Sequence, residues 1–190
     1  ARSLRQTLDQ LDSRPLTVGV FVNSDAHIVN RIARYCNLDW VQLSGNESWD
    51  YCRDIERPFI KVIHITPQKG VNELLREIDT GYQTVPGRFI CLLDTGAERS
   101  YGGTGETFNW SIAREVAFRY PVIVAGGLTP DNAGNLIKKV NPWGVDVSTG
   151  VETEGEKDET KIGNFINAVR EAGRDPSLYD NMKTTEIKKF

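Results

Sequence analysis

The feature of this sequence that most constrains its fold is a regular alternation between short apolar runs and helical apolar stripes. Stripes with the i, i+3, i+4, i+7 spacing of one helix face cover residues 71–78, 133–140 and 162–169. Six runs have the Val-, Ile- and Phe-rich composition of β-strands: Thr17–Val22, Trp40–Leu43, Phe59–Ile65, Phe89–Leu93, Pro121–Ala125 and Gly144–Val147. Several runs are apolar on both faces, which is typical of strands buried in a parallel sheet. The alternation therefore predicts an α/β protein built from βα units.

The spacing of these strands leaves two candidate architectures. Successive strand midpoints lie roughly 20 to 30 residues apart, the size of one βα unit. Six strands suit a doubly wound open sheet, whereas the glycine-rich strand ends described below favour a (β/α)8 TIM barrel. We expect residues 1–173 to form a single barrel domain of six parallel βα units that lacks the first two strands. Residues 174–190 are polar, and we expect them to form a C-terminal extension.

Local signals predict where two helices begin. Ser24 can cap the helix after the first strand, and Thr129 followed by Pro130 is an N-cap with proline at the first helical position. Residues 1–11 have leucines on one helix face, with no cap or turn before them. We therefore expect the printed chain to begin within a longer protein.

Composition excludes several classes of function. The net charge is −3 and no basic stripe is present, so neither nucleic acid nor an anionic membrane surface is an expected partner. The 3 cysteines and 2 histidines are scattered without the spacing of a zinc site or a disulfide framework. No apolar stretch approaches the length of about 18 residues that a membrane span needs, and no signal peptide is visible. We expect a cytoplasmic protein, and a site for a small anionic substrate would have to be built locally.

The most informative segment for chemistry begins where the fourth predicted strand ends. Asp94 ends that strand, and the loop after it contains Gly102, Gly103, Thr104 and Gly105. The carboxyl ends of barrel strands form the catalytic face, and an Asp buried there is costly unless it is paired or used. A glycine-rich loop can supply amides to an anion or close over a site. Equally, Asp94 could simply cap the following turn, with glycines chosen for loop shape.

Two further strand ends carry small residues. The fifth strand ends in Gly126 and Gly127, directly before the helix that Pro130 begins. The sixth is followed by polar and small residues, namely Asp146, Ser148, Thr149 and Gly150. Consecutive strand ends of this kind resemble the phosphate site that barrels build after their seventh and eighth strands. The alternative is a pair of tight turns without a ligand.

Six ordered strings together resemble the signature of the phosphoribosylanthranilate isomerase family. They are VGVFVN, VQLSGNE, LLDT, YGGTGETFNW, VAGGLTPDN and GVDVSTGVE, and they span Gly19 to Glu152. The resemblance implies a TIM barrel that performs an Amadori rearrangement in tryptophan biosynthesis without metal or organic cofactor. Its substrate is N-(5-phosphoribosyl)anthranilate, and its product is the 1-deoxyribulose phosphate isomer.

The resemblance also implies roles for individual residues. Asp94 matches the general acid that protonates the furanose ring oxygen, and Asp146 lies where the sugar hydroxyls would sit. The phosphate would be held by Gly126, Gly127, Ser148, Thr149 and Gly150. Residues 102–107 match the loop over the substrate.

This chain departs from the family pattern in three ways. The family's general base is a cysteine in a Lys-Ile-Cys-Gly motif on the first strand, and no such motif is present. The arginine that meets the anthranilate carboxylate is also absent, and Ser44 stands where a histidine is more frequent. Cys91 is three residues before Asp94 and should point to the opposite face of its strand, so it is a poor substitute base. Cys36 and Cys52 are expected on or beside helices, away from the catalytic face.

Three hypotheses follow from these observations. The first is the isomerase, with its base on a first strand outside the printed sequence. The second is a non-catalytic module that binds phosphate without turnover, and the third is another phosphate-binding barrel such as an epimerase or indole-glycerol-phosphate synthase. Because open sheet edges invite pairing, we also expect either a homo-oligomer or an N-terminal segment that completes the barrel.

Overall fold

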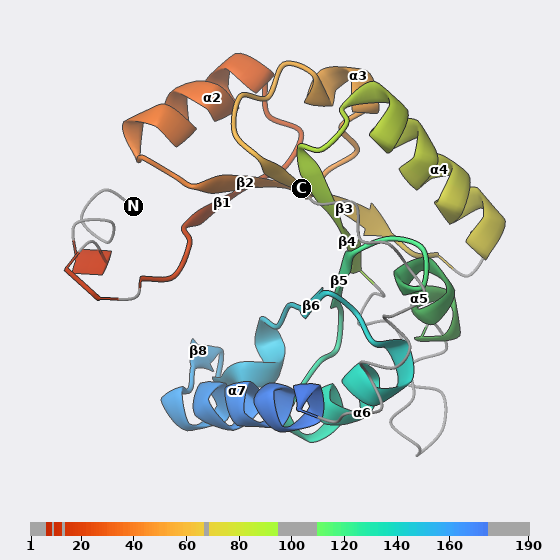
Figure 1. Cartoon of the computed structure of the whole chain (residues 1–190). Helices are drawn as coiled ribbons and strands as arrows, with labels where there is room; N and C mark the ends of the chain where they lie inside the picture. The colour runs from red at the N-terminus through yellow and green to blue at the C-terminus, as the bar shows by residue number, and fades with distance from the viewer. Residues whose placement is uncertain (1–6, 9, 13, 67–68, 95–109, 175–190) are drawn as a thin grey trace. The chain divides into compact units, whose positions relative to one another are not determined.

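The computed structural model describes residues 7–8, 10–12, 14–66, 69–94 and 110–174 (Figure 1). Six strands form one sheet in the order in which they occur along the chain. The first strand pairs in parallel with the second, the second with the third, and the fifth with the sixth. They are β1 (Val18–Phe21), β2 (Trp40–Leu43), β3 (Phe59–His64), β4 (Phe89–Asp94), β5 (Val122–Ala125) and β6 (Gly144–Val145). All six predicted strands are therefore confirmed, with β1 and β6 each two residues shorter than expected.

Helices follow the strands in the described part of the chain. They are α2 (Ala26–Tyr35), α3 (Trp49–Cys52), α4 (Val71–Thr84), α5 (Trp110–Ala117), α6 (Pro130–Val140) and α7 (Glu159–Gly173), with a short 3-10 turn, η1, at Thr149–Val151. The three predicted apolar stripes lie within α4, α6 and α7, which confirms them. Strand order and helix placement are those of an α/β protein of the barrel type.

Two local predictions can be compared with the helix starts. Thr129 is the N-cap of α6 and Pro130 follows it, as expected. The prediction for Ser24 is wrong, because Asp25 occupies the N-cap of α2 and the Ser24 hydroxyl instead donates to the carbonyl of Val22 at 3.5 Å. The helix predicted over residues 1–11 lies largely outside the described residues.

A small antiparallel hairpin after η1 was not predicted. It consists of β7 (Glu152–Thr153) and β8 (Glu156–Lys157). The two connecting residues, Glu154 and Gly155, both have positive φ, 53° and 83°. This is the backbone of a tight hairpin turn, which more often carries Asn-Gly or Asp-Gly. The Glu-Gly pair is a weaker signal, which explains why the sequence did not reveal it.

The chain has two compact units, residues 1–63 with 75–92 and residues 64–74 with 93–190. In the first, an aromatic cluster centres on Phe89 of β4. Its ring centroid lies 4.8 Å from that of Trp49, 5.7 Å from that of Phe59 and 4.7 Å from that of Tyr82. The cluster packs α3 and α4 onto the sheet, and a Cβ at Gly81 would lie 2.6 Å from the Trp49 ring. Rings at these separations add to the free energy of burial.

A buried ion pair organises the ends of β1 and β2 in the same unit. Lys61 of β3 donates to the carbonyl of Gly45 and lies 3.3 Å from Glu47 Oε2, with side-chain exposures of 7% and 2%. The other oxygen of Glu47 accepts from the amides of Asn23 at 2.8 Å and Gly45 at 3.3 Å. Because both charges are paired and hydrogen-bonded, the interior tolerates them. The pair therefore joins the loops after β1 and β2 to β3.

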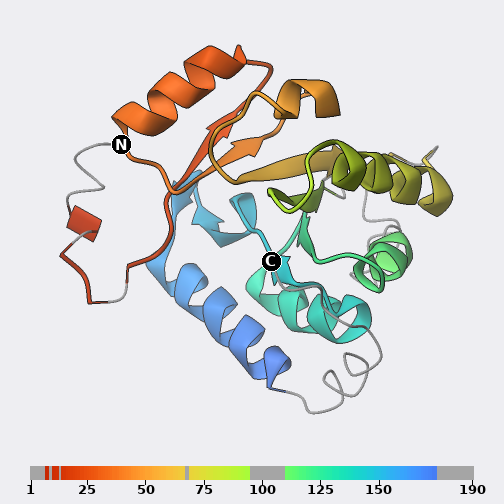
Figure 2. The same ribbon diagram turned by 45° about the horizontal axis from the view of Figure 1, so that its top comes forward.

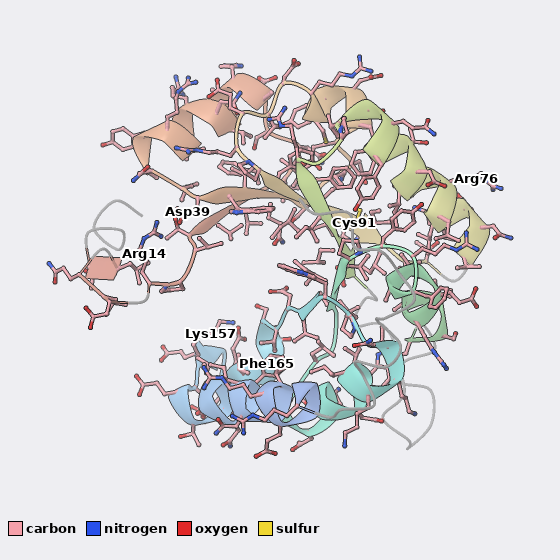
Figure 3. All side chains as sticks on the ribbon, in the orientation of Figure 1. Arg14, Asp39, Arg76, Cys91, Lys157 and Phe165 are labelled. Carbon is pink, nitrogen blue, oxygen red and sulfur yellow. The ribbon has the colours of Figure 1, made fainter. Side chains whose placement is uncertain are left out.

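A second ion pair holds the segment before β1. Arg14 contacts both carboxylate oxygens of Asp39, at 2.9 and 3.0 Å (Figure 3). The same carboxylate accepts from the amide and hydroxyl of Thr17 at 2.7 and 2.8 Å. These hydrogen bonds, from Arg14 first, hold the pKa of Asp39 well below its usual range, although partial burial works in the other direction.

In the second unit, α6 and α7 pack side by side, as both ribbon views show (Figures 1 and 2). Ile137 of α6 and Ala172 of α7 are buried together, with Val145 and Val169 against them. This packing fixes α6, and with it the N-terminal end of α6 that directly follows β5. The described helices of the chain are too short or too polar to cross a membrane.

Candidate functional site

The strand ends of β3 and β4 bring a histidine and a carboxylate together in the second unit. His64 is the last residue of β3 and Asp94 the last of β4. His64 Nδ1 and Asp94 Oδ2 lie 3.3 Å apart, and the side chains are 50% and 34% exposed. Both groups are therefore open to a small molecule at the carboxyl edge of the sheet.

Main-chain pairing fixes these two strand ends. The amide of Ile65, directly after His64, donates to the carbonyl of Asp94 at 3.0 Å. Adjacent parallel strands that stay paired through their last residues present those side chains at the same edge of the sheet. The proximity of His64 to Asp94 is therefore a property of the strand register.

Asp146 adds a second carboxylate after β6. Its amide donates to the carbonyl of Val124 at 2.9 Å, so the chain is still paired with β5 at this point. The pKa of Asp146 is raised, first because the surrounding protein partly desolvates the carboxyl and second because the charge of Asp94 repels its anion. Lys157 acts in the opposite direction. Asp94 and Asp146 thus lie within electrostatic range of each other.

The loop after β5 is shaped by two glycines. Gly126 and Gly127 have φ values of +97° and +63°, which favour glycine. The side chain of Asn132 spans the turn, since its amide nitrogen donates to the carbonyl of Gly127 and its oxygen accepts from the amide of Thr129, both at 2.9 Å. α6 then begins at Pro130. A helix N-terminus that follows such a turn is suited to a phosphate group.

The loop after β6 lies directly against this turn. A Cβ at Gly150 would be 1.7 Å from the carbonyl oxygen of Leu128 and 3.2 Å from Cα of Thr129. Only glycine allows the two backbones to come this close. The predicted residues of the two loops, Gly126 and Gly127 in one and Ser148, Thr149 and Gly150 in the other, therefore form one local structure.

Lys157 places a positive charge beside the same loop. Its Nζ donates to the carbonyl and the hydroxyl of Ser148 at 3.0 and 3.2 Å and lies 2.5 Å from Glu152 Oε1. Lys157 was not predicted as a site residue, because the hairpin that carries it was not predicted. A lysine a few residues after a small-residue strand end was the available signal.

His64 was also missed as a site residue. Its position could have been inferred, because it ends the strand that precedes the strand ending in Asp94. The predicted loop residues Gly102, Gly103, Thr104 and Gly105 lie outside the described residues. Among the residues that are described, no cluster of three metal-ligating side chains occurs.

Cys52 and Cys36 lie on or beside helices, as the sequence predicts, and Cys91 lies on β4. Cys91 is 2% exposed on β4, and burial raises the pKa of its thiol well above its usual range (Figure 3). Cys52 ends α3, and burial raises the pKa of its thiol to about 11. Cys36 follows the last residue of α2. A thiol with a raised pKa is a weak source of thiolate, so neither Cys91 nor Cys52 is suited to proton abstraction.

Parallel βα units with a carboxylate and a glycine-shaped turn at the strand ends are typical of a barrel-type enzyme. A family model described as N-(5'phosphoribosyl)anthranilate (PRA) isomerase matches residues 3–168, and the chain belongs to this family. An N-(5'-phosphoribosyl)anthranilate isomerase from Dehalococcoides mccartyi is 46% identical over 172 residues, which are 90% of this chain and 78% of the relative.

Solved structures agree with the family and the fold. The phosphoribosyl anthranilate isomerase of Thermotoga maritima has a TM-score of 0.71 and 33% identity, covering 88% of this chain and 78% of that one. A second structure, with a TM-score of 0.68 and 30% identity, covers 88% of this chain and 77% of its own. It is a phosphoribosyl anthranilate isomerase in complex with reduced 1-(o-carboxyphenylamino)-1-deoxyribulose 5-phosphate. The (β/α)8 barrel type predicted from the sequence is thereby confirmed.

Proposed function

We propose that this protein isomerises N-(5-phosphoribosyl)anthranilate to 1-(2-carboxyphenylamino)-1-deoxyribulose 5-phosphate, a step of tryptophan biosynthesis. Family membership is the observation that carries this proposal. The solved relative that holds a reduced form of the product supports a phosphorylated small molecule as the ligand. The alternative, a module that binds phosphate without turnover, is not favoured by the family match.

In this proposal, Asp94 is the general acid. It protonates the furanose ring oxygen while the C1′–O bond breaks and the anthranilate nitrogen forms a Schiff base. A carboxyl group that is 34% exposed at a strand end can reach a bound sugar, which is the first requirement of a general acid. Removal of the C2′ proton by a base then gives an enolamine, which tautomerises to the ketone.

The substrate phosphate would lie over the local structure made by Gly126, Gly127 and residues 148–150. The close approach of Gly150 to the backbone of Leu128 supports a single anion site at the start of α6. Lys157, held beside Ser148, adds a positive charge that favours the dianion. Asp146, which is exposed at the strand end and within electrostatic range of Asp94, is suited to bind a sugar hydroxyl. The predicted glycines 102–105 remain a proposed covering loop.

The general base is proposed to be a cysteine on a first strand outside the 190 printed residues. The raised pKa values of Cys52 and Cys91 support this choice, because they disfavour the thiolate. Two finer proposals accompany it. The protein is cytoplasmic, as expected for a biosynthetic enzyme, and the exposed valines of β1, Val18 and Val20, are covered either by a second copy or by a further segment. Sedimentation of the purified protein would distinguish a monomer from an oligomer.

Loss of substrate fluorescence tests the proposed activity. The purified protein, at its full encoded length, should consume N-(5-phosphoribosyl)anthranilate, and Asp94→Asn should lower kcat by at least about 100-fold, the usual contribution of a general acid. Binding of the product without turnover would instead support the phosphate-binding module. Turnover that Asp94→Asn leaves unchanged would remove Asp94 from its assigned role.

A further inference from the structure

We infer that His64 is a positioning residue that supplies the proton which Asp94 delivers to the substrate. The inference rests on the proposed isomerase function and deepens it. His64 is not part of the family strings in the sequence. It becomes a candidate only because the ends of β3 and β4 place it beside Asp94. Its Nδ1 lies 3.3 Å from Asp94 Oδ2, and the paired ends of β3 and β4 hold this arrangement.

The exposure of the His64 and Asp94 side chains favours a role in catalysis over a role in stabilising the fold. The His64 side chain is 50% exposed and that of Asp94 is 34% exposed. Ion pairs so open to water contribute little to the free energy of folding. The same exposure gives the imidazole access to solvent, which a group that must be reprotonated in each turnover requires.

A general acid at neutral pH needs a supply of protons. An ordinary aspartic acid side chain in water is protonated in only about one molecule in a thousand at pH 7, whereas an ordinary imidazole is protonated in about a quarter. An imidazole in contact with the carboxylate can therefore act as its proton donor, because the carboxylate by itself is rarely protonated. From the imidazole, the proton reaches the reacting oxygen in two transfers, by way of Asp94.

The Nδ1–H bond of the imidazolium breaks, and the proton passes to Oδ2 of Asp94, which leaves a neutral imidazole and a carboxylic acid. Asp94 gives this proton to the ring oxygen as the C1′–O bond breaks and the nitrogen lone pair forms the C1′=N bond. Solvent returns a proton to the imidazole, and the proton removed from C2′ later restores the overall balance.

The neighbouring charges allow this cycle. Asp146 after β6 is within electrostatic range of Asp94, and Lys157 on β8 acts on Asp146 from the other element. Both groups therefore belong to the electrostatic surroundings of the pair. Neither group is altered in the variants described below, so a change in pH dependence would belong to His64.

Two histidine variants separate this role from a structural one. In His64→Asn the amide nitrogen replaces Nδ1 as a donor but cannot carry a titratable proton. His27→Asn is the matched control, since His27 is exposed on α2. We expect His64→Asn to lower kcat at least tenfold at neutral pH with KM within twofold. The limb of the kcat profile near neutral pH should be present in the unaltered protein and in His27→Asn but missing in His64→Asn.

Two further measurements address the route through Asp94. In an Asp94→Asn background, His64→Asn should cause no additional loss of kcat, because the two residues act in series. Added imidazole should restore kcat to His64→Ala in proportion to its concentration. A His64→Asn protein with unchanged kcat and the same pH limb would overturn the inference while leaving the isomerase intact. Absence of turnover by the unaltered protein would overturn the proposed function, and this inference with it.

Discussion

At the scale of single residues, the site brings together carboxyl groups whose negative charges repel each other. Asp146 is the clearest case, because surrounding protein and Asp94 both raise the pKa of its carboxyl. Ionising such a carboxyl costs free energy in the folded state that it does not cost in the unfolded chain. Functional carboxylates are often held in this way at the expense of stability.

Asp146→Asn should therefore separate function from stability. A raised folded-state pKa contributes stability that is complete below the unfolded value and is lost as pH rises through the folded value. Asparagine does not ionise, so its contribution to the free energy of unfolding does not fall as pH rises. At pH 7 the variant should therefore be at least as stable as the unaltered protein, whereas at acidic pH it should not be more stable. If Asp146 binds a sugar hydroxyl, kcat/KM should fall about tenfold to 100-fold. Urea unfolding at several pH values and steady-state kinetics check the two parts, and a variant that is less stable at pH 7 would contradict the assignment of the pKa shift.

The contribution of Asp39 to stability should have the opposite dependence on pH. Its folded-state pKa is lowered, so its contribution to stability is present above the unfolded value near about 3.9 and is lost as pH falls through the folded value. Asp39→Asn should cost about 2 kcal/mol at pH 7, because it removes the charged acceptor shared by Arg14 and Thr17. The cost should shrink in acid, as measured by urea unfolding at neutral and acidic pH.

The exposed pair of Arg34 and Glu56 provides the control for Asp39. Its side chains are 58% and 51% exposed, and Glu56→Gln should change the unfolding free energy by less than about 1 kcal/mol. If Glu56→Gln lowered the unfolding free energy as much as Asp39→Asn, loss of a charge alone would explain both effects. The partly buried network around Asp39 would then have no special contribution.

At the scale of elements, the anion site depends on the contact between the loops after β5 and β6. Gly150→Ala would drive a Cβ into the carbonyl oxygen of Leu128 and separate these loops. We expect a loss of about 1–3 kcal/mol in stability and at least a tenfold rise in KM. Gly127→Ala is the matched variant, because a Cβ there meets nothing within 4 Å and only the φ of +63° is strained, at a cost of roughly 1 kcal/mol. Kinetics in which both variants have the same KM as the unaltered protein would contradict a phosphate site at this contact.

The elements also show which features the sequence could predict. Strand positions followed from Val- and Ile-rich runs, and the start of α6 followed from Thr129 and Pro130, because these signals are local. The ion pair of Lys61 and Glu47 was not predicted, although a lysine within the run Phe59–Ile65 required a partner. That partner lies 14 residues earlier in the chain, in a loop whose conformation no local signal specifies.

At the scale of the whole molecule, the family assignment depended on the order of six short sequence strings along the chain. Six strings in sequence order resembled the family signature, and the family model over residues 3–168 confirms the membership. The contact between His64 and Asp94 could not be read from either residue alone, because it depends on the register of two neighbouring strands. Function in this chain therefore follows from strand ends that are distant in sequence and adjacent in the sheet.

The most direct test of the central claim is turnover of N-(5-phosphoribosyl)anthranilate by the protein that carries this chain at its full encoded length. Substrate fluorescence should disappear with enzyme-dependent kinetics, and the same protein with Asp94→Asn should be at least about 100-fold slower. Tight binding of the product with no loss of substrate fluorescence, by a folded protein, would contradict the claim that it is an isomerase.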